Sequence, residues 1–350
     1  MRNSFNVIVS ILLMMFSYTS YSQLRGPRIK PNEYTRKNKS APLYQYTKAF
    51  TYARGVYTDS SGMLYFGNAD GCVIRYNMDT KSSDLVMKIP TIVEIRDLEV
   101  SGDTMFAMHS GHDGLIVKIA PEGPKEYLQL PEWEGVFLDA LDFNGNVGFL
   151  MGDPVDSLFT LFHTLDGGVT WNRCEGQVKA HEGEVAFAAS GSNVHVMNDS
   201  TYMFVTGGLK SNFYISRDNG ATWSSVTLPF YPHKTIGPYS MCFADDKIGV
   251  MVGGNYLQPN LKLNTTYYTF DGGETWFNSM DSPSGYRSCV YHVNGVFYAC
   301  GRNGIDFSTD GGETWTPFAM GVYFSLTHSG DQLIATTRIG RFQSFDLIQP

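Results

Sequence analysis

The hydrophobic pattern along most of the chain is one of short alternating runs separated by turns rich in Gly, Asp and Asn. Residues 63–67 and 104–108 are typical, with apolar side chains bounded by polar or glycine-rich residues. A period of two places successive side chains on opposite faces of a strand, so such runs predict half-buried strands. Apolar spacing typical of amphipathic helices is nearly absent. The pattern therefore predicts an all-β protein.

One motif, [ST]-x-D-x-G-x-T-W, occurs four times without a gap, at 164–171, 216–223, 269–276 and 308–315. The Asp carboxylate can accept backbone N–H bonds across a turn, and the Gly can adopt φ > 0. The Trp begins the next strand, where it can wedge into the core. A calcium-binding loop would need more carboxylates than the single one in each motif, so we predict that the motifs have a structural role. These structural residues are Asp166, Trp171, Asp218, Trp223, Asp271, Trp276, Asp310 and Trp315.

The alternating runs repeat with a period suited to four-stranded units. Aligned inner-strand segments recur every 37–54 residues, which is the length of one propeller blade. We therefore predict a seven-bladed β-propeller in which each motif joins the third and fourth strands of a blade. The predicted inner-strand segments are 53–56, 95–98, 138–141, 185–188, 239–242, 286–289 and 323–326.

The last predicted blade lacks a fourth strand, because the chain ends soon after residues 341–347. Residues 42–48 lie just before the first inner strand and can supply it. Pairing the two ends of the chain would close the ring and leave no exposed sheet edge.

Three arginines, Arg54, Arg96 and Arg287, occupy the second position of the aligned inner segments. We expect them to converge at one mouth of the central channel, on the face opposite the repeated turns. Arginine presents a fixed fork of donors suited to carboxylate or phosphate. The alternative is that these arginines pair with nearby carboxylates and brace the channel. The acidic residues considered for that role are Asp97, Asp139 and Glu184.

The same face is expected to carry further candidates. Arg302 and Tyr256, on loops between second and third strands, are candidate ligand-binding residues. The His109 and His112 pair lacks a spaced third ligand, so no metal site is predicted. No nucleotide fingerprint, haem motif or redox CxxC is present, so no cofactor is predicted.

The N-terminus predicts export. Residues 1–22 combine a short basic region, an apolar run and small residues before Gln23, which is typical of a signal peptide cleaved near Ser22. Residues 23–40 are polar and basic and are expected to form a flexible arm, so residues 41–350 would form a single propeller domain. The mature protein is expected to be periplasmic or extracellular, without membrane insertion.

The charge distribution bears on partners. The first 40 residues contribute +6 to a formal net charge of −8, so the remainder carries −14. A body this acidic argues against nucleic acid and anionic membranes. We expect a monomer that binds an anionic glycan or an exported protein. Among five cysteines, Cys289 and Cys300 lie opposite each other across a two-residue hairpin, and either a disulfide or two free thiols fits this placement.

The four motifs resemble the Asp-box, or bacterial neuraminidase repeat. Together with residues 152–156, 183–190, 253–256 and 285–290, they make the chain similar to secreted propellers of the photosystem II assembly/stability factor and sialidase-like kind. The first resemblance implies a binding or assembly protein whose arginine-lined face holds another protein. The second implies a glycan-active enzyme, either a sialidase-like glycoside hydrolase or a polysaccharide lyase.

The enzymatic alternative assigns roles to particular residues. The three arginines would clamp a sugar carboxylate, Asp139 or Asp153 would act as acid/base, and Tyr286 with Glu184 would form a nucleophile pair. Sialidases carry Ile-Pro after the first arginine and have six blades. Here Gly55 and Val56 follow Arg54, and seven blades are predicted.

Overall fold

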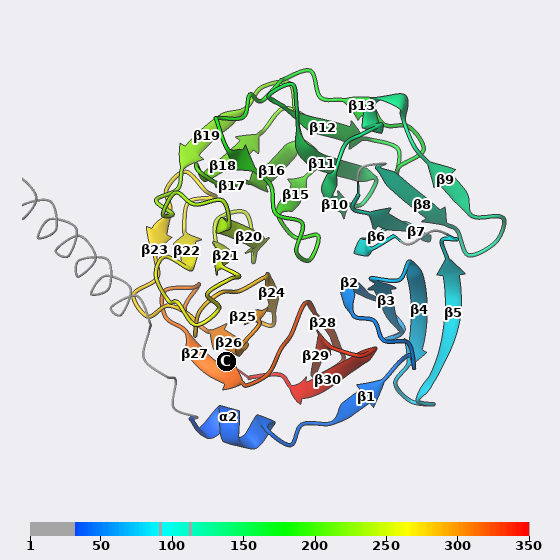
Figure 1. Cartoon of the computed structure of the whole chain (residues 1–350), viewed down its shortest axis with the longest axis vertical. Coiled ribbons are helices and arrows are strands. Elements are labelled where there is room, and N and C mark those ends of the chain that lie inside the picture. The colour runs from blue at the N-terminus through cyan, green and yellow to red at the C-terminus, as the bar shows by residue number, and fades with distance from the viewer. Residues whose placement is uncertain (1–31, 91–92, 112–113, 350) are drawn as a thin grey trace, which may run out of the picture.

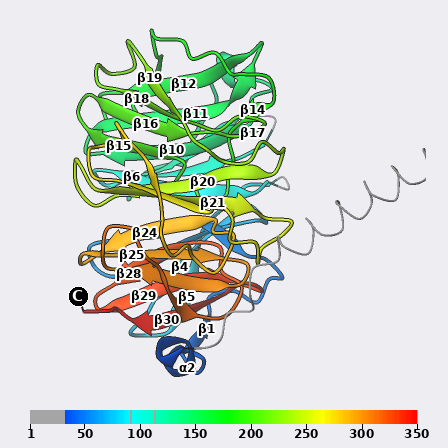
Figure 2. The same cartoon turned by 90° about the vertical axis from the view of Figure 1, so that its left-hand side faces the viewer.

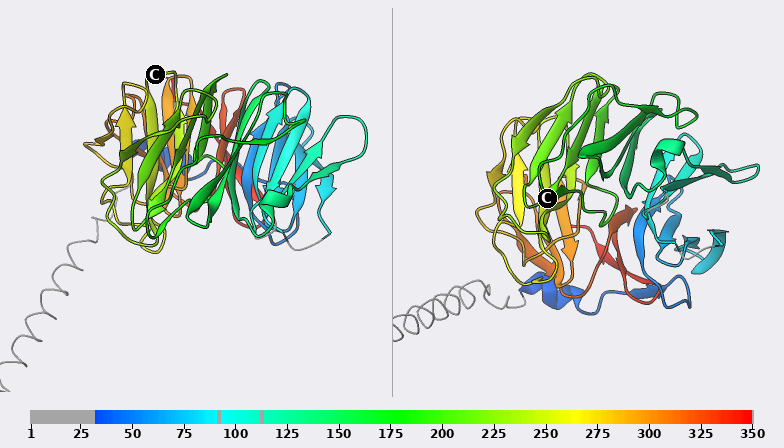
Figure 3. Two further views of the ribbon diagram at one scale, coloured as in Figure 1. Left: turned by 90° about the horizontal axis from the view of Figure 1, so that it is seen from above. Right: turned by 45° about the horizontal axis from the view of Figure 1, so that its top comes forward.

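A computed structural model describes residues 32–90, 93–111 and 114–349, and it shows seven four-stranded sheets arranged in a ring around a central axis (Figure 1). The ring is a thin disc, with the strands running across its thickness (Figure 3). In blades 1 to 6 the antiparallel strands follow chain order from the centre outwards, since short turns can join only neighbouring antiparallel strands. The prediction of a seven-bladed β-propeller with four-stranded blades is confirmed.

The first three blades follow the chain without interruption. Blade 1 contains β2 (Ala53–Thr58), β3 (Leu64–Asn68), β4 (Cys72–Asn77) and β5 (Ser82–Lys88). Blade 2 contains β6 (Ile95–Ser101), β7 (Thr104–His109), β8 (Leu115–Ile119) and β9 (Glu126–Leu128). After the short 3-10 helix η1 (Pro131–Trp133), blade 3 contains β10 (Leu138–Asn144), β11 (Val147–Val155), β12 (Leu158–Thr164) and β13 (Asn172–Arg173).

Three further blades follow. Blade 4 contains β15 (Val194–Asn198), β16 (Thr201–Val205), β18 (Asn212–Ser216) and β19 (Ser224–Thr227). Blade 5 contains β20 (Ile236–Phe243), β21 (Gly249–Asn255), β22 (Thr266–Thr269) and β23 (Phe277–Asn278). Blade 6 contains β24 (Cys289–Val293), β25 (Val296–Gly301), β26 (Gly304–Ser308) and β27 (Thr316–Ala319).

Blade 7 closes the ring with both ends of the chain. It contains β28 (Leu326–Ser329), β29 (Gln332–Thr337), β30 (Arg341–Asp346) and, as its outer strand, β1 (Leu43–Gln45). Tyr44 pairs with Phe342 in the antiparallel β1–β30 ladder, and their rings stack 5.0 Å apart. Closure by the N-terminal strand is therefore confirmed, and it covers the edge of β30 that would otherwise be unpaired.

The inner strand of blade 4 differs from the prediction. The expected segment, 185–188, contributes only its first residue to β14 (Glu184–Val185), which pairs with β17 (Gly207–Gly208) outside the main sheet. The inner strand is β15, which begins at Val194. The alternating apolar residues at 185–188 belong to an inserted loop and not to the inner strand. This insertion accounts for the longer sequence spacing between inner strands at this blade.

Residues 33–38 also differ from the expectation of a flexible arm. They form helix α2 (Glu33–Asn38), capped by the Asn32 side chain, which accepts a hydrogen bond from the Thr35 amide. The helix lies at the rim of the disc (Figure 2), against β27 of blade 6 (Figure 1), and Tyr34 packs edge-on against Phe307 at 5.1 Å. Local capping and this contact order the segment. The proposed signal peptide and residues 23–31 lie outside the described residues.

The repeated turns have the predicted structure. In the first, Asp166 accepts bonds from the Thr170 amide at 2.9 Å and the Thr170 hydroxyl at 2.6 Å. Although partial burial opposes ionisation, the hydrogen bonds from Thr170 and Thr164 lower the pKa of Asp166 to about 2. The tryptophans pack between blades: Trp223 contacts Phe149 of blade 3 and Phe204 of blade 4. These residues stabilise turns and blade contacts.

Candidate functional site: a basic, aromatic pocket at the channel mouth

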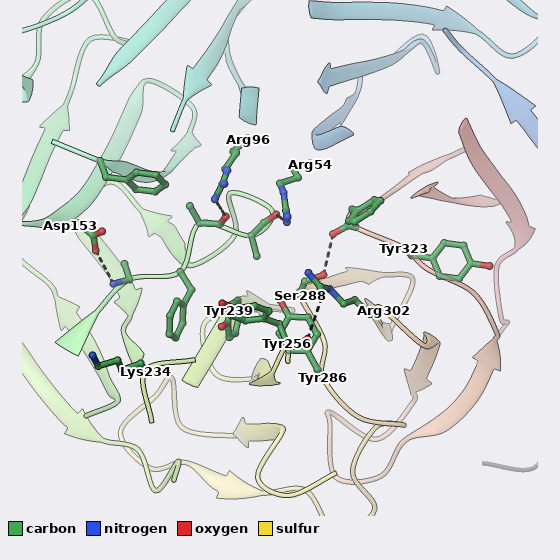
Figure 4. A pocket seen from close by; sticks show the side chains of 16 residues that line it. Arg54, Arg96, Asp153, Lys234, Tyr239, Tyr256, Tyr286, Ser288, Arg302 and Tyr323 are labelled. Atoms are coloured by element: carbon green, nitrogen blue, oxygen red, sulfur yellow. Dashed lines mark hydrogen bonds between the residues drawn. The ribbon is translucent and has the colours of Figure 1, made fainter. Parts of the chain in front are cut away.

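A pocket of about 390 Å³ opens at the channel mouth on the face opposite the repeated turns (Figure 4). It is built from inner-strand starts and from loops between second and third strands, as the strand directions predicted. Four cations line it, together with one carboxylate and several aromatic rings. The principal lining residues are Arg54, Arg96, Lys234, Arg302, Asp153, Phe137, Phe187, Tyr239, Tyr256, Tyr286, Ser288, Tyr323 and Phe324.

The floor of the pocket is the segment 186–193, which we call the plug. The plug connects β14 to β15, the inner strand of blade 4, and crosses the channel, so it meets the inner strands of other blades. The Ala186 amide donates to Asp153 of blade 3, and the Ser190 hydroxyl donates to the Ser288 carbonyl of blade 6. Ser192 bonds Ser240 of blade 5. These contacts hold the plug across the channel, where it forms the floor of the pocket.

Arg54 and Arg96 lie side by side and share one carboxylate. Arg54 Nε is 2.9 Å from Glu94 Oε1, and Arg96 Nη2 is 2.8 Å from Glu94 Oε2. Burial opposes ionisation of Glu94, but the Arg96 and Arg54 guanidiniums outweigh it and lower its pKa. Each arginine also donates to the plug, to the carbonyls of Ala189 at 2.8 Å and Ala188 at 2.6 Å. Both arginines therefore brace the floor.

The guanidinium groups of Arg54 and Arg96 also pack against aromatic rings. The Arg54 guanidinium carbon lies 5.4 Å from the Tyr52 ring centroid and 5.7 Å from that of Phe324. Arg96 lies 5.5 Å from Phe137. These cation–π contacts restrict the rotamers of both side chains, so the positive charge at the floor is held in a fixed place.

Lys234 and Arg302 are the cations left for a ligand. Both are exposed, and neither has a carboxylate partner within the described part of the chain. Arg302 stacks over Tyr256 at 5.4 Å and donates to the Tyr256 carbonyl at 3.3 Å. The pocket thus presents positive charge that the protein itself does not neutralise, in a chain whose net charge is negative.

One wall is a cluster of tyrosines around Tyr239. Tyr286 meets it edge-on at 4.9 Å, and Phe187 of the plug stacks on it at 4.3 Å. Burial raises the pKa of Tyr239 and of Tyr286 far above neutrality, so both hydroxyls remain protonated. Such rings offer an apolar body with a hydrogen-bonding tip.

The third predicted arginine does not reach the pocket. Arg287 is fully buried inside blade 6, where its Nε lies 2.7 Å from Asp306 Oδ2 and its Nη1 donates to the Tyr286 carbonyl. Ser288 lines the pocket in its place. The amides of Ser288 and Cys289 both face Cys300 in a bulge, so Ser288, and not Arg287, occupies the position that Arg54 has in blade 1. The sequence alignment of the inner strands was therefore one residue out of register in blade 6. A one-residue shift moves a side chain to the opposite face of a strand.

The candidate carboxyl groups are also dispersed. Asp153 lines the pocket, and burial raises its pKa. Asp139 is completely buried, and burial raises its pKa well above the ordinary range. Glu184 lies inside blade 4, bonded to Thr206, Asn212 and Tyr214. Tyr286 and Glu184 are therefore not brought together as a pair.

Sequence reasoning missed Glu94, Lys234 and the plug. Glu94 precedes an inner strand and Lys234 lies in a loop between blades, so neither occupied an aligned repeat position. Among the residues that the structure describes, no group of three His, Cys, Asp or Glu side chains is placed to hold a metal. His112 lies outside the described residues. No helix in the described ranges is long and apolar enough to cross a bilayer.

Comparison with known families agrees with this architecture. Residues 306–317, which span the fourth repeated turn, match the model of the BNR/Asp-box repeat. The chain is a BNR-type β-propeller. Residues 159–296 of this propeller also match the Sortilin-Vps10 model, described as sortilin, neurotensin receptor 3. A comparison with curated protein sequences finds no match.

Several solved propellers are similar in shape. A virginiamycin B lyase from Staphylococcus aureus, catalytically inactive and with quinupristin, has a TM-score of 0.67 at 13% identity, over 88% of this chain and 99% of that one. YCF48 bound to a D1 peptide has a TM-score of 0.62 at 13% identity, over 93% and 98%. A GH74 enzyme from Niastella koreensis scores 0.61 at 13%, over 85% and 53%. Identities this low show a shared fold alone.

Proposed function

We propose that this BNR-type propeller is a binding or assembly protein that holds a carboxylate-bearing segment of another protein in the pocket at its channel mouth. The observation that carries the proposal is the pair of exposed cations, Lys234 and Arg302, beside aromatic walls and above a floor already fixed by Arg54 and Arg96. Guanidinium and ammonium groups that lack an internal partner favour an anion from outside.

The comparisons support a protein segment as the ligand. The Sortilin-Vps10 model is described as a receptor, neurotensin receptor 3, and YCF48 is a propeller of known structure with a bound D1 peptide. The glycan-active alternative loses support, because Arg287 and Glu184 point into blades and Asp153 is the one carboxyl group among the pocket-lining residues described. An anionic glycan remains an outcome of the test.

The test is selection of a random twelve-residue peptide library displayed on phage, with residues 23–350 as bait. We expect enriched sequences to contain Asp, Glu or a free C-terminal carboxylate, and their binding to weaken as salt rises. The Lys234→Ala/Arg302→Ala double variant should lose this enrichment. The matched control, Arg217→Ala/Lys247→Ala, removes the same charge from the opposite face and should keep it.

Two results would overturn the proposal. The first is no enrichment on the native protein, or enrichment that the double variant retains. The second is binding or turnover of polygalacturonate or sialyllactose by the native protein, lost on Asp153→Asn, since this would identify a glycan-active site.

A further inference from the structure

Four exposed apolar side chains lie on adjoining loops of blades 4 and 5 that border the pocket. We call them the lip. Leu209 is 42% exposed, Tyr231 63%, Leu257 62% and Leu263 50%. Scattered exposed apolar residues need no explanation, but a group on adjoining loops at the edge of a pocket is typical of an interaction site.

Hydrogen bonds hold these loops against one another. The His233 amide donates to the Gly208 carbonyl at 3.1 Å, which joins the loops of Leu209 and Tyr231. The Asn264 side chain donates to the Pro229 carbonyl at 3.1 Å, which joins the loops of Tyr231 and Leu263. The lip is therefore one surface assembled before any partner arrives.

The lip is continuous with the pocket wall. Lys234 of the pocket lies three residues after Tyr231, and Tyr256 immediately precedes Leu257. The Thr235 hydroxyl donates to Asn255 Oδ1 at 2.9 Å, tying the two loops together next to the pocket. An apolar surface therefore adjoins the pocket on the side of blades 4 and 5, where it can contact the part of a ligand that extends out of the pocket.

The loops around the lip carry a net positive charge. The loops 176–183, 207–211, 228–235 and 256–265 contain four lysines and a single carboxylate, Glu182, although the whole chain is net negative. Two of these lysines are exposed and two are partly exposed. They are Lys179, Lys210, Lys234 and Lys262.

We infer that the lip and the pocket together bind one extended acidic segment of a partner protein, whose carboxylate enters the pocket and whose adjacent apolar side chains cover Leu209, Tyr231, Leu257 and Leu263. The inference rests on the proposed function and specifies the partner's chemistry. Basic loops select an acidic segment by charge complementarity, and the apolar lip favours alternating apolar side chains. A concave pocket suits a peptide better than a flat bilayer, which the negative body of the protein would repel.

The experiment separates the pocket from the lip. The most enriched displayed peptide is synthesised with a fluorescent label and titrated by fluorescence anisotropy against the native protein, Tyr231→Ser/Leu257→Ser and the control Val169→Ser. Val169 is 69% exposed on the opposite face, in a repeated turn. We expect the double variant to raise Kd at least ten-fold and the control to leave it unchanged. Replacing the peptide's apolar residues with Ser should weaken native binding to the same extent and add little to the double variant.

The outcomes distinguish this inference from the proposed function. If acidic peptides bind and need Lys234 and Arg302, but the lip variants and Ser-substituted peptides bind normally, the lip inference is wrong and the proposed function stands. If no acidic peptide binds, both fail. Vesicles containing phosphatidylserine are the further arm: co-sedimentation that depends on Tyr231 and Leu257 would instead identify a membrane surface and overturn the inference. Circular dichroism confirms that each variant is folded.

Discussion

Replacing Arg287 tests whether this arginine stabilises blade 6 or serves the pocket. The Arg287→Met substitution keeps most of the side-chain volume but removes the charge. Both partners of the pair are almost completely buried, with side-chain exposures of 0% for Arg287 and 1% for Asp306. Asp306 would keep only the bonds from the Ser284 amide at 3.1 Å and hydroxyl at 2.6 Å.

The expected magnitude follows from the uncompensated charge. Breaking a fully buried ion pair by removing one partner costs about 3–5 kcal/mol, because the remaining ion stays desolvated. For a chain of this size such a loss lowers the melting temperature by roughly 4–7 °C. Differential scanning calorimetry of Arg287→Met measures this change directly. Removing the second charge as well, in Arg287→Met/Asp306→Leu, should restore most of the stability.

A matched surface change provides the control. Arg302→Met removes a charge of the same kind from an exposed pocket position and should change the free energy of unfolding by about 0.5 kcal/mol or less. An unchanged melting temperature for Arg287→Met would refute the bracing argument. So would a double variant no more stable than the single one, since the penalty would then not come from an unpaired Asp306.

Four further predictions concern the turns, the closure and the cysteines. Asp271→Ala should lower the free energy of unfolding by about 1–2 kcal/mol without affecting peptide binding, because it removes the acceptor of the Thr275 amide and hydroxyl bonds; denaturant titration measures this, and lost binding with unchanged stability would contradict it. The depressed pKa of Asp166, about 2 against 3.8, contributes stability above its ordinary pKa, so melting temperature should fall as pH drops from about 4 to 2, and less so in Asp166→Asn. A protein starting at residue 41 should stay folded and monomeric, whereas one starting at residue 49 loses β1 and should aggregate in size-exclusion chromatography; equal behaviour would contradict the closure. Cys289 and Cys300 are directly paired, buried free thiols, so refolding with oxidised glutathione should leave three of the five thiols open to alkylation in denaturant, and five would show that the pair does not bridge.

The sequence alone determined the architecture, because its evidence is local and repeated. The turn motif specifies the hydrogen bonds around residues such as Asp166 within five positions of the chain. Alternating apolar residues specify strands, and the spacing between them specifies blades. The missing outer strand of blade 7 made closure by residues 42–48 predictable, because an unpaired edge has one free segment nearby to cover it.

Only the tertiary structure decided the composition of the site. The aligned position of Arg287 differed by one residue from that of Arg54, and in a strand that difference is enough to turn a pocket residue into a buried one. The plug looked like a strand because its alternation is genuine, yet its backbone bonds go to other blades. Glu94 joins two arginines that are 42 residues apart in sequence. Such contacts depend on where distant segments meet in three dimensions, which no local pattern encodes.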